Sequence, residues 1–199
     1  MDSNSPRSES LTAATLLQRS LQEHLEAIQA LLESSLGEIE LAGALITATL
    51  NQGGKILLCG NGGSAADSQH IAAELVGRYE LHRRAWPAIA LTTDTSALTA
   101  LSNDYGYEDV FARQVEALGK REDVALGIST SGRSPNVLMA LEAVNAKGMK
   151  TIALTGRDGG VIGKAAGIHI NVSHPSTARV QEVHRTVIHA ICALVERAR

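Results

Sequence analysis

The stretch KILLCGNGGSAAD, residues 55–67, decides the fold because an apolar run leads into a glycine-rich turn and then into a helix. Residues 55–59 have the length and composition of a buried strand. The three glycines that follow let the backbone approach a ligand closely, and the free N–H groups at the helix start favour an anion. A turn made only for tight geometry is equally compatible with this motif.

The same turn nearly matches the dinucleotide fingerprint, as G-x-G-x-x-A over residues 60–65. That fingerprint needs an acidic residue at the end of the second strand, and Asp94 lies too far beyond the apolar run at 88–91. We therefore expect no nucleotide cofactor. Ser64 is the expected N-cap of the helix, with Asp67 three residues later.

Short apolar runs alternate with helical stretches along the rest of the chain. The runs are residues 55–59, 88–91, 124–128, 151–154 and 168–172. The helical stretches lie near 64–77, 96–102, 108–118, 135–147, 161–166 and 178–199, the last with Val180, Val183, Val187, Ile191 and Leu194 facing inward. This alternation predicts an α/β three-layer sandwich, in which helices cover both faces of a five-stranded parallel sheet.

Two helices are expected before the sheet, over residues 11–52, between a flexible tail at 1–10 and the main domain at 53–199. Their apolar stripes are Leu17, Leu21, Leu25, Ile28 and Leu32, then Leu36, Ile39, Gly43, Ile46 and Leu50. Helices outside the βα pattern either pack on their own sheet or bury their stripe against another copy. The need to bury such a stripe favours an oligomer interface.

Composition excludes several classes of protein. The chain has 199 residues, one domain's length, and a net charge of −3 without a block of like charges. Non-specific electrostatic binding to nucleic acid or to an anionic membrane is therefore not expected. There is no signal-like apolar segment near the start and no apolar run of the ~20 residues that span a bilayer. Cys59 and Cys192 are expected to be buried thiols of a reducing compartment, which indicates the cytoplasm.

A second polar turn, GISTSGRSP at residues 127–135, follows the third apolar run. Four hydroxyl groups and a glycine precede Pro135, which suits the first position of a helix. Hydroxyl donors and free N–H groups at a helix start can hold a phosphate monoester. One hydroxyl would suffice to cap the helix, so four favour phosphate binding over capping by Ser134 alone. No Walker A lysine is present.

Two pairs of polar residues are placed to share a site. His70 and Glu74 are four apart on the helix after the glycine-rich turn, and Gln181 and His189 are eight apart on the last helix. Together they suggest an acid/base or a metal site. Each residue taken singly is more readily explained as a solvated helix residue, and spacing alone does not decide whether the four form a site.

The motifs resemble those of the phosphoheptose isomerases of the SIS family. They are GNGGSAADSQHIAAELVG at 60–77, GISTSGRS at 127–134 and ARVQEVHRTVIH at 178–189, and the segments 103–106 and 153–160 also fit. The resemblance covers nearly the whole chain. It implies a homotetramer with sites between subunits. It also implies aldose–ketose isomerisation of sedoheptulose 7-phosphate to D-glycero-D-manno-heptose 7-phosphate, an early step towards the nucleotide-activated heptoses of lipopolysaccharide.

The resemblance also implies roles for individual residues. The phosphate loop would be Ser129, Thr130, Ser131 and Ser134, and the sugar chain would contact Asn61, Gly62, Gly63, Glu74, Asn103, Asp104 and Gln181. A zinc ion would be held by His70, Glu74, Gln181 and His189, and Glu74 and His189 would form the acid/base pair. Some family members carry an aspartate where this chain has Ala178, so no role is carried to that position.

Two other readings remain open within the same family. Some SIS relatives serve as non-catalytic adaptors of the bacterial replication initiator, and these lack the glutamate that matches Glu74. Others isomerise different sugar phosphates, and no residue in the sequence indicates the chain length of the sugar. The presence of Glu74 favours an enzyme.

Overall fold

The computed structural model describes residues 12–198 and contains one sheet of five parallel strands in the order β2-β1-β3-β4-β5. The predicted tail at residues 1–10 lies outside the described part of the chain. The strands are β1 (Ile56–Gly60), β2 (Ala88–Ala90), β3 (Val124–Ser129), β4 (Lys150–Gly156) and β5 (Ile168–Val172). All five match the predicted apolar runs, and the α/β sandwich is confirmed.

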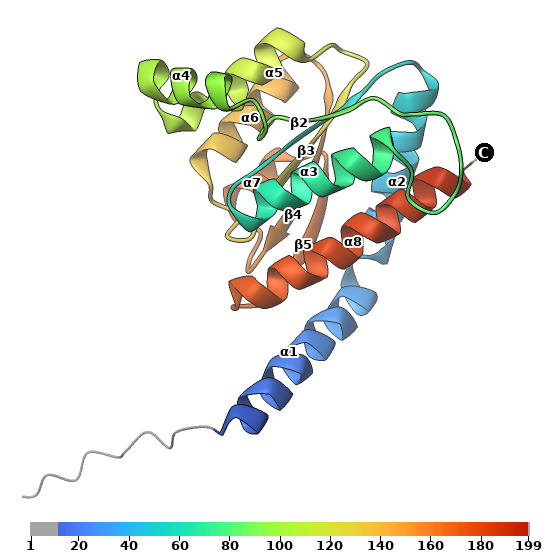
Figure 1. Ribbon diagram of the computed structural model, residues 1–199, viewed down its shortest axis with the longest axis vertical. Coiled ribbons are helices and arrows are strands. Elements are labelled where there is room, and N and C mark those ends of the chain that lie inside the picture. The colour runs from blue at the N-terminus through green and yellow to red at the C-terminus, as the bar shows by residue number, and fades with distance from the viewer. Residues whose placement is uncertain (1–11, 199) are drawn as a thin grey trace, which may run out of the picture.

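Helices cover both faces of this sheet (Figure 1). They are α1 (Ala13–Ser34), α2 (Leu36–Asn51), α3 (Gly63–Val76), α4 (Thr95–Tyr105), the 3-10 turn η1 (Tyr107–Asp109), α5 (Ala112–Leu118), α6 (Pro135–Ala146), α7 (Gly160–Ala165) and α8 (Thr177–Arg197). Along β1, Ile56 and Leu58 pack towards α2, α3 and α8, whereas Leu57 and Cys59 pack towards α5, α6 and α7. Side chains that alternate between two apolar layers explain why β1 and β3 are buried along their whole length.

The strand order places two loops side by side. β2, the next strand after β1 in the sequence, pairs with one edge of β1, and β3 pairs with its other edge. Gly60 at the end of β1 pairs with Ile128, one residue before the end of β3. The loops that follow these strands therefore meet at the carboxyl edge of the sheet, where open α/β sheets bind ligands.

The helix α1 extends away from the rest of the molecule (Figure 1, blue). Arg179 of α8 holds it by donating hydrogen bonds to the carbonyl and hydroxyl oxygens of Ser20. Ala27 and Leu31 are buried, but the predicted stripe is not: Leu21 and Leu25 are 67% and 61% exposed. Among residues 12–198, no other part of the chain covers the exposed leucines of α1.

The helices α2 and α8 approach each other closely at Gly43. A side chain there would meet Leu194 of α8 at 2.9 Å, so the small residue permits this contact as predicted. The expected burial of Leu194 was wrong, because this residue lies at the rim of the helix pair and is 39% exposed. Leu36 at the start of α2 is likewise exposed.

Neither thiol forms a disulfide, since Cys59 and Cys192 are both buried and free. Burial raises the pKa of each thiol to about 12, so both stay protonated at neutral pH. Within residues 12–198, no helix has the length and apolar character required to cross a membrane.

His184 of α8 is a buried titratable group in the core. Its Nε2 lies 2.9 Å from the carbonyl oxygen of Thr155, to which it donates, and its Nδ1 has no partner among the residues that the structure describes. Burial lowers the pKa of this imidazole from 6.5 to about 4. The folded protein therefore keeps His184 neutral at pH values where the unfolded chain binds a proton.

We predict that His184 makes stability depend on pH between about 6.5 and 4. In this window the unfolded state holds more protons, so the free energy of unfolding falls as the pH falls, by up to ~1.4 kcal/mol per pH unit from this residue. The free energy of unfolding, measured with urea at pH 7, 5.5 and 4.5, should depend less on pH in the variant His184→Gln than in the wild type. An identical pH dependence of the two proteins would contradict the prediction.

Candidate active site

The glycine-rich turn after β1 is tied to the start of α6. The carboxamide of Asn61 exchanges two hydrogen bonds of 2.9 Å with that of Asn136, and the Tyr107 hydroxyl donates to Asn61 Oδ1 at 3.1 Å. These groups border a small cavity of about 200 Å³. Its lining residues are Asn61, Tyr107, Glu108, Ser134, Pro135 and Asn136.

The predicted N-cap of α3 is wrong. Gly62 occupies the N-cap position with φ of +56°, and Ser64 is a buried residue of the first turn that makes no side-chain cap bond. Only glycine adopts this backbone conformation without strain. A side chain at Gly63 would lie 2.5 Å from the Gln181 carboxamide, so the absence of one lets Gln181 lie directly against the turn.

The serine-rich turn after β3 forms a cluster of hydroxyl groups. Ser129 Oγ lies 2.9 Å from Ser134 Oγ and 3.4 Å from Ser131 Oγ, and Thr130 lies between them in the chain. Ser134 precedes α6, with Pro135 at the first helical position as predicted, but its hydroxyl makes no cap bond. The hydroxyls therefore face one another at the helix start instead of capping it, which leaves donors for a ligand.

The loop that precedes α7 supports the serine-rich turn from outside. Gly132 has φ of +67°, and a side chain there would meet the carbonyl oxygen of Gly159 at 2.3 Å. Arg133 is engaged by Asp158 through two bonds of 2.8 and 2.6 Å, and this pairing lowers the pKa of the Asp158 carboxyl to about 2. Because the charge of Arg133 is paired, the hydroxyl cluster of the serine-rich turn consists of neutral groups.

A second group of polar side chains forms where α3 packs on α8. His70 Nε2 lies 2.8 Å from His189 Nε2, so one ring nitrogen donates to the other, and His70 Nε2 lies 3.6 Å from Glu74 Oε1. The donor atoms of all three residues lie within 4.8 Å of one another, and all three side chains are half-buried. The structure thus brings together Glu74 and His189, the predicted acid/base pair.

Gln181 lies apart from this group. Its carboxamide contacts Gly63 at the start of α3, whereas His189 lies about 12 Å further along α8. Between these points, Arg185 donates to the buried carboxylate of Asp67 at 2.5 Å. Three successive contacts, in the same order on both helices, show that α3 and α8 run in the same direction.

The donor set suits a divalent metal of the zinc type. Two histidines and one carboxylate are the three protein ligands of many catalytic zinc sites. Two nitrogens that both bind zinc at ~2.0–2.1 Å lie roughly 3.3 Å apart in tetrahedral geometry. The His70 and His189 rings would have to separate by about half an ångström to bind one ion, since their nitrogens are now 2.8 Å apart.

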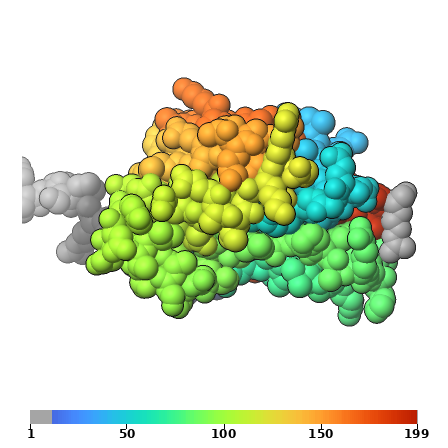
Figure 2. Space-filling model, turned by 90° about the horizontal axis from the view of Figure 1, so that it is seen from above, coloured from blue at the N-terminus to red at the C-terminus, as the bar shows by residue number. Residues whose placement is uncertain are grey.

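One residue of the site region, Tyr79, was not singled out in the sequence, and two predicted residues, Asn103 and Asp104, lie on the surface. Tyr79 stacks on the His189 ring with a centroid distance of 5.5 Å and an interplanar angle of 27°. It lies in an irregular segment without periodicity, so no sequence pattern marked it. Asn103 and Asp104 are exposed and hydrogen-bonded to each other on α4, which forms one end of the molecule (Figure 2, yellow-green).

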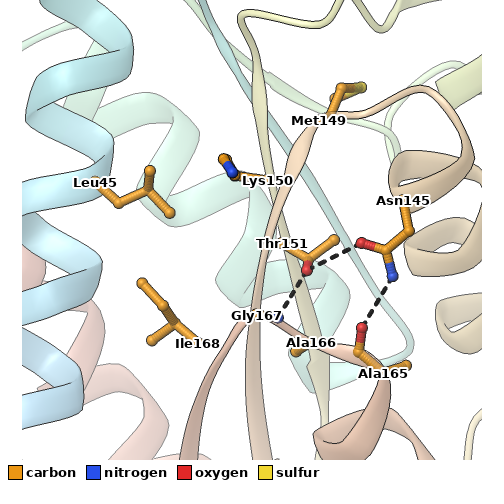
Figure 3. Close-up of a pocket in the computed structure, with 9 residues that line it drawn as sticks. All are labelled: Leu45, Asn145, Met149, Lys150, Thr151, Ala165, Ala166, Gly167 and Ile168. Carbon is orange, nitrogen blue, oxygen red and sulfur yellow. Dashed lines mark hydrogen bonds between the residues drawn. The ribbon is translucent and has the colours of Figure 1, made fainter.

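A larger pocket lies at the opposite edge of the sheet (Figure 3). It is bordered by Lys150 and Ile168, the first residues of β4 and β5, and has a volume of about 500 Å³. Two of its polar side chains are already paired, since Asn145 donates to the Ala165 carbonyl and Thr151 donates to Asn145. Among the described residues, those around this pocket form no metal-ligating cluster like that of His70, Glu74 and His189.

Comparisons with known proteins agree with this architecture. The SIS domain family matches residues 20–156, so the fold and the two loops define an SIS protein. A phosphoheptose isomerase of Helicobacter pylori strain P12 is 53% identical over 182 residues, which cover 92% of this chain and 95% of the relative. One of Citrifermentans bemidjiense is 54% identical over 177 residues, or 89% and 92% of the two chains.

Solved structures lead to the same family. A phosphoheptose isomerase from Neisseria gonorrhoeae superposes with a TM-score of 0.88 at 46% identity, covering 93% of this chain and 99% of the other. One from Francisella tularensis gives 0.90 at 35% identity, covering 94% and 100%. The chain belongs to the phosphoheptose isomerase family.

We predict that Gly132→Ala destabilises the protein more than Gly148→Ala does. Both glycines have positive φ, of 67° and 71°, so both variants carry the same backbone strain of about 1–2 kcal/mol. Only at Gly132 would the new methyl group also collide with a neighbouring backbone, since the nearest atom at Gly148 is 3.9 Å away. Urea unfolding of the two variants measures the difference, and equal losses would refute the tight packing of this loop.

Proposed function

We infer that the protein is an aldose–ketose isomerase that converts sedoheptulose 7-phosphate to D-glycero-D-manno-heptose 7-phosphate. The observation that carries this inference is the group of His70, Glu74 and His189, with donor atoms within 4.8 Å, in a chain about 50% identical to phosphoheptose isomerases. The hydroxyl cluster at Ser129–Ser134 supplies a neutral cradle for the phosphate.

The isomerisation removes a proton from C1 of the ketose and delivers one to C2, through a cis-enediol. We assign the carbon-bound proton to Glu74 and the transfer between the two oxygens to His189, which needs both groups close to the reacting carbons. The two side chains come from α3 and α8, which fixes their separation. The bound phosphate restrains the substrate at a point remote from the chemistry and contributes binding energy.

Phosphate binding is assigned to Ser129, Thr130, Ser131 and Ser134, with α6 beginning directly after them. Sugar contacts are assigned to Asn61, Gly62, Gly63, Asn103, Asp104 and Gln181, besides Glu74 itself. Asn61 borders the cavity beside Ser134, and Gln181 lies against Gly63, which supports these assignments for the turn after β1.

We further propose that His70, Glu74 and His189 hold a zinc ion, whereas Gln181, the fourth expected ligand, contacts Gly63 instead. The metal would polarise the sugar oxygens and stabilise negative charge on the enediolate. A carboxylate bound to a metal is a weaker base, so Glu74 can serve as the base only when it is not a full ligand. Its 3.6 Å distance from His70 is compatible with either role.

The zinc site predicts a stabilising effect that is independent of turnover. Zinc added to protein stripped with a chelator should raise the melting temperature and restore the rate, because the ion binds the folded state only. The variant His70→Ala should lose the temperature shift. An unchanged melting temperature on adding zinc to the stripped wild-type protein would argue against the site.

We propose that the protein forms a homotetramer with active sites between subunits. Among the residues described, the cavity beside the serine-rich turn is lined by none of His70, Glu74 and His189, so one chain does not enclose the substrate by itself. The exposed leucine stripe of α1 offers the surface that a second copy would cover. An assembled site also accounts for a helix that extends from the molecule.

Charge on the leucine stripe is expected to disrupt the assembly. Leu25→Glu would bury a carboxylate in the interface, so light scattering should report a smaller mass and isomerase activity should fall. Ala30→Glu places the same charge on α1 about 140° around the helix and serves as the control. A tetrameric Leu25→Glu variant would exclude the stripe from the interface.

Loss of the proposed base should abolish turnover. We expect Glu74→Gln to lower kcat by about 10²–10⁴-fold without a change in the mass of the assembly, because the amide keeps the shape but cannot accept the proton. Formation of the aldose from sedoheptulose 7-phosphate is followed by NMR. A rate near that of the wild type would remove Glu74 from the mechanism.

An adaptor role is less well supported, because the chain retains the glutamate at position 74 that such adaptors lack. Binding of the replication initiator without isomerase activity would reverse this assignment.

We propose a cytoplasmic location, which agrees with two buried free thiols.

A further inference from the structure

The segment between α3 and β2, residues 77–87, contains neither helix nor strand, yet one buried carboxylate fixes its course. Glu196 of α8 accepts hydrogen bonds from the backbone N–H groups of Tyr79, Glu80 and Leu81, at 2.8, 2.9 and 2.8 Å. Arg83 Nε donates to the same carboxylate at 3.0 Å. The side chains of Glu196 and Arg83 are 2% and 4% exposed.

Arg83 acts on the last turn of α3. Its guanidinium donates to the carbonyl oxygens of Glu74, at 2.7 Å, and Leu75, at 2.9 Å, and lies 3.6 Å from the centre of the Trp86 ring. Carbonyl groups at the end of a helix have no partner within the helix, and a cation satisfies them well. Arg83 therefore holds the backbone from which Glu74 projects.

Glu196 acts on the other reactive side chain through Tyr79. The N–H of Tyr79 is bound by Glu196, and the ring of Tyr79 stacks on the imidazole of His189. His189 also contacts His70, with ring centroids 5.0 Å apart at an angle of 64°. The imidazole thus contacts two rings, and the position of one of them, Tyr79, depends on Glu196.

We propose that Glu196 and Arg83 are positioning residues that set the separation of Glu74 and His189. The proposal rests on the acid/base roles assigned to Glu74 and His189 above. Neither member of the buried pair needs to touch the substrate. Because proton transfer depends steeply on distance, a shift of about 1 Å in this pair would lower kcat far more than it changes KM.

The chain contains a matched control at the other edge of the sheet. Asp123 is also a buried carboxylate, and it accepts from Lys55 Nζ and from the backbone N–H groups of Lys55 and Lys120. Glu196→Gln and Asp123→Asn each replace a buried carboxylate by an amide that leaves a cation unpaired. Both should lower the melting temperature.

Only Glu196→Gln should lower kcat, by about 10–100-fold with KM changed less than about threefold, while kcat of Asp123→Asn stays within about twofold of the wild type. Equal kcat losses in the two variants would mean that both act through stability alone and would overturn the proposal. So would a Glu196→Gln variant with wild-type kcat.

Substitutions at Tyr79 provide a test that leaves the buried pair of Glu196 and Arg83 intact. Tyr79→Leu should lower kcat, whereas Tyr79→Phe, which keeps the stacked ring, should lower kcat much less.

A structural measurement separates this proposal from the assigned function. Amide hydrogen exchange at Tyr79, Glu80 and Leu81 should be faster in Glu196→Gln than in the wild type or Asp123→Asn. Unchanged exchange would overturn the positioning role even if the wild type is active. If the wild type does not isomerise sedoheptulose 7-phosphate, the assigned function fails. Faster exchange in Glu196→Gln would still show that Glu196 holds residues 79–81 in place.

Discussion

Helix α3 packs on α8 in the same direction, and the contacts between them follow one another in register. Gly63 meets Gln181, Asp67 pairs with Arg185, and His70 meets His189. The Asp67 carboxylate is buried, so a slip that separated it from Arg185 would leave an uncompensated charge in the core. This register determines which residues of the last helix face the reactive side chains of α3, and the candidate site depends on it.

The proposed phosphate site follows a different physical rule. The molecule carries a net charge of −3, and the guanidinium of Arg133 beside the serine-rich turn is paired with Asp158, so the proposal does not rely on an unpaired Arg133. Four hydroxyl-bearing residues and the start of α6 take its place at the carboxyl edge of the sheet. Neutral donors of this kind bind an anion by hydrogen bonds and the helix dipole, without the desolvation of a buried cation.

Local patterns predicted the strands and most of the helices well, because the central strands β1, β3 and β4 are buried almost throughout and show as apolar runs. The errors lie where another element competes with local preference. Ser64 has the chemistry of an N-cap, but the close packing of Gln181 on the turn moves the helix start to Gly62. Leu194 continues an apolar stripe and packs on Gly43 of α2, yet it lies at the rim of this helix pair and stays 39% exposed.

The sequence by itself determined the sheet, the two polar turns at its edge and the residue types of the site, since periodicity and turn chemistry are local properties. Only the tertiary structure decided that His70, Glu74 and His189 meet while Gln181 lies beside Gly63. It also decided that Glu196 and Arg83 form the buried pair that fixes the segment at residues 77–87. Contacts between residues more than 100 positions apart depend on how α3 and α8 pack, and no local pattern encodes that packing.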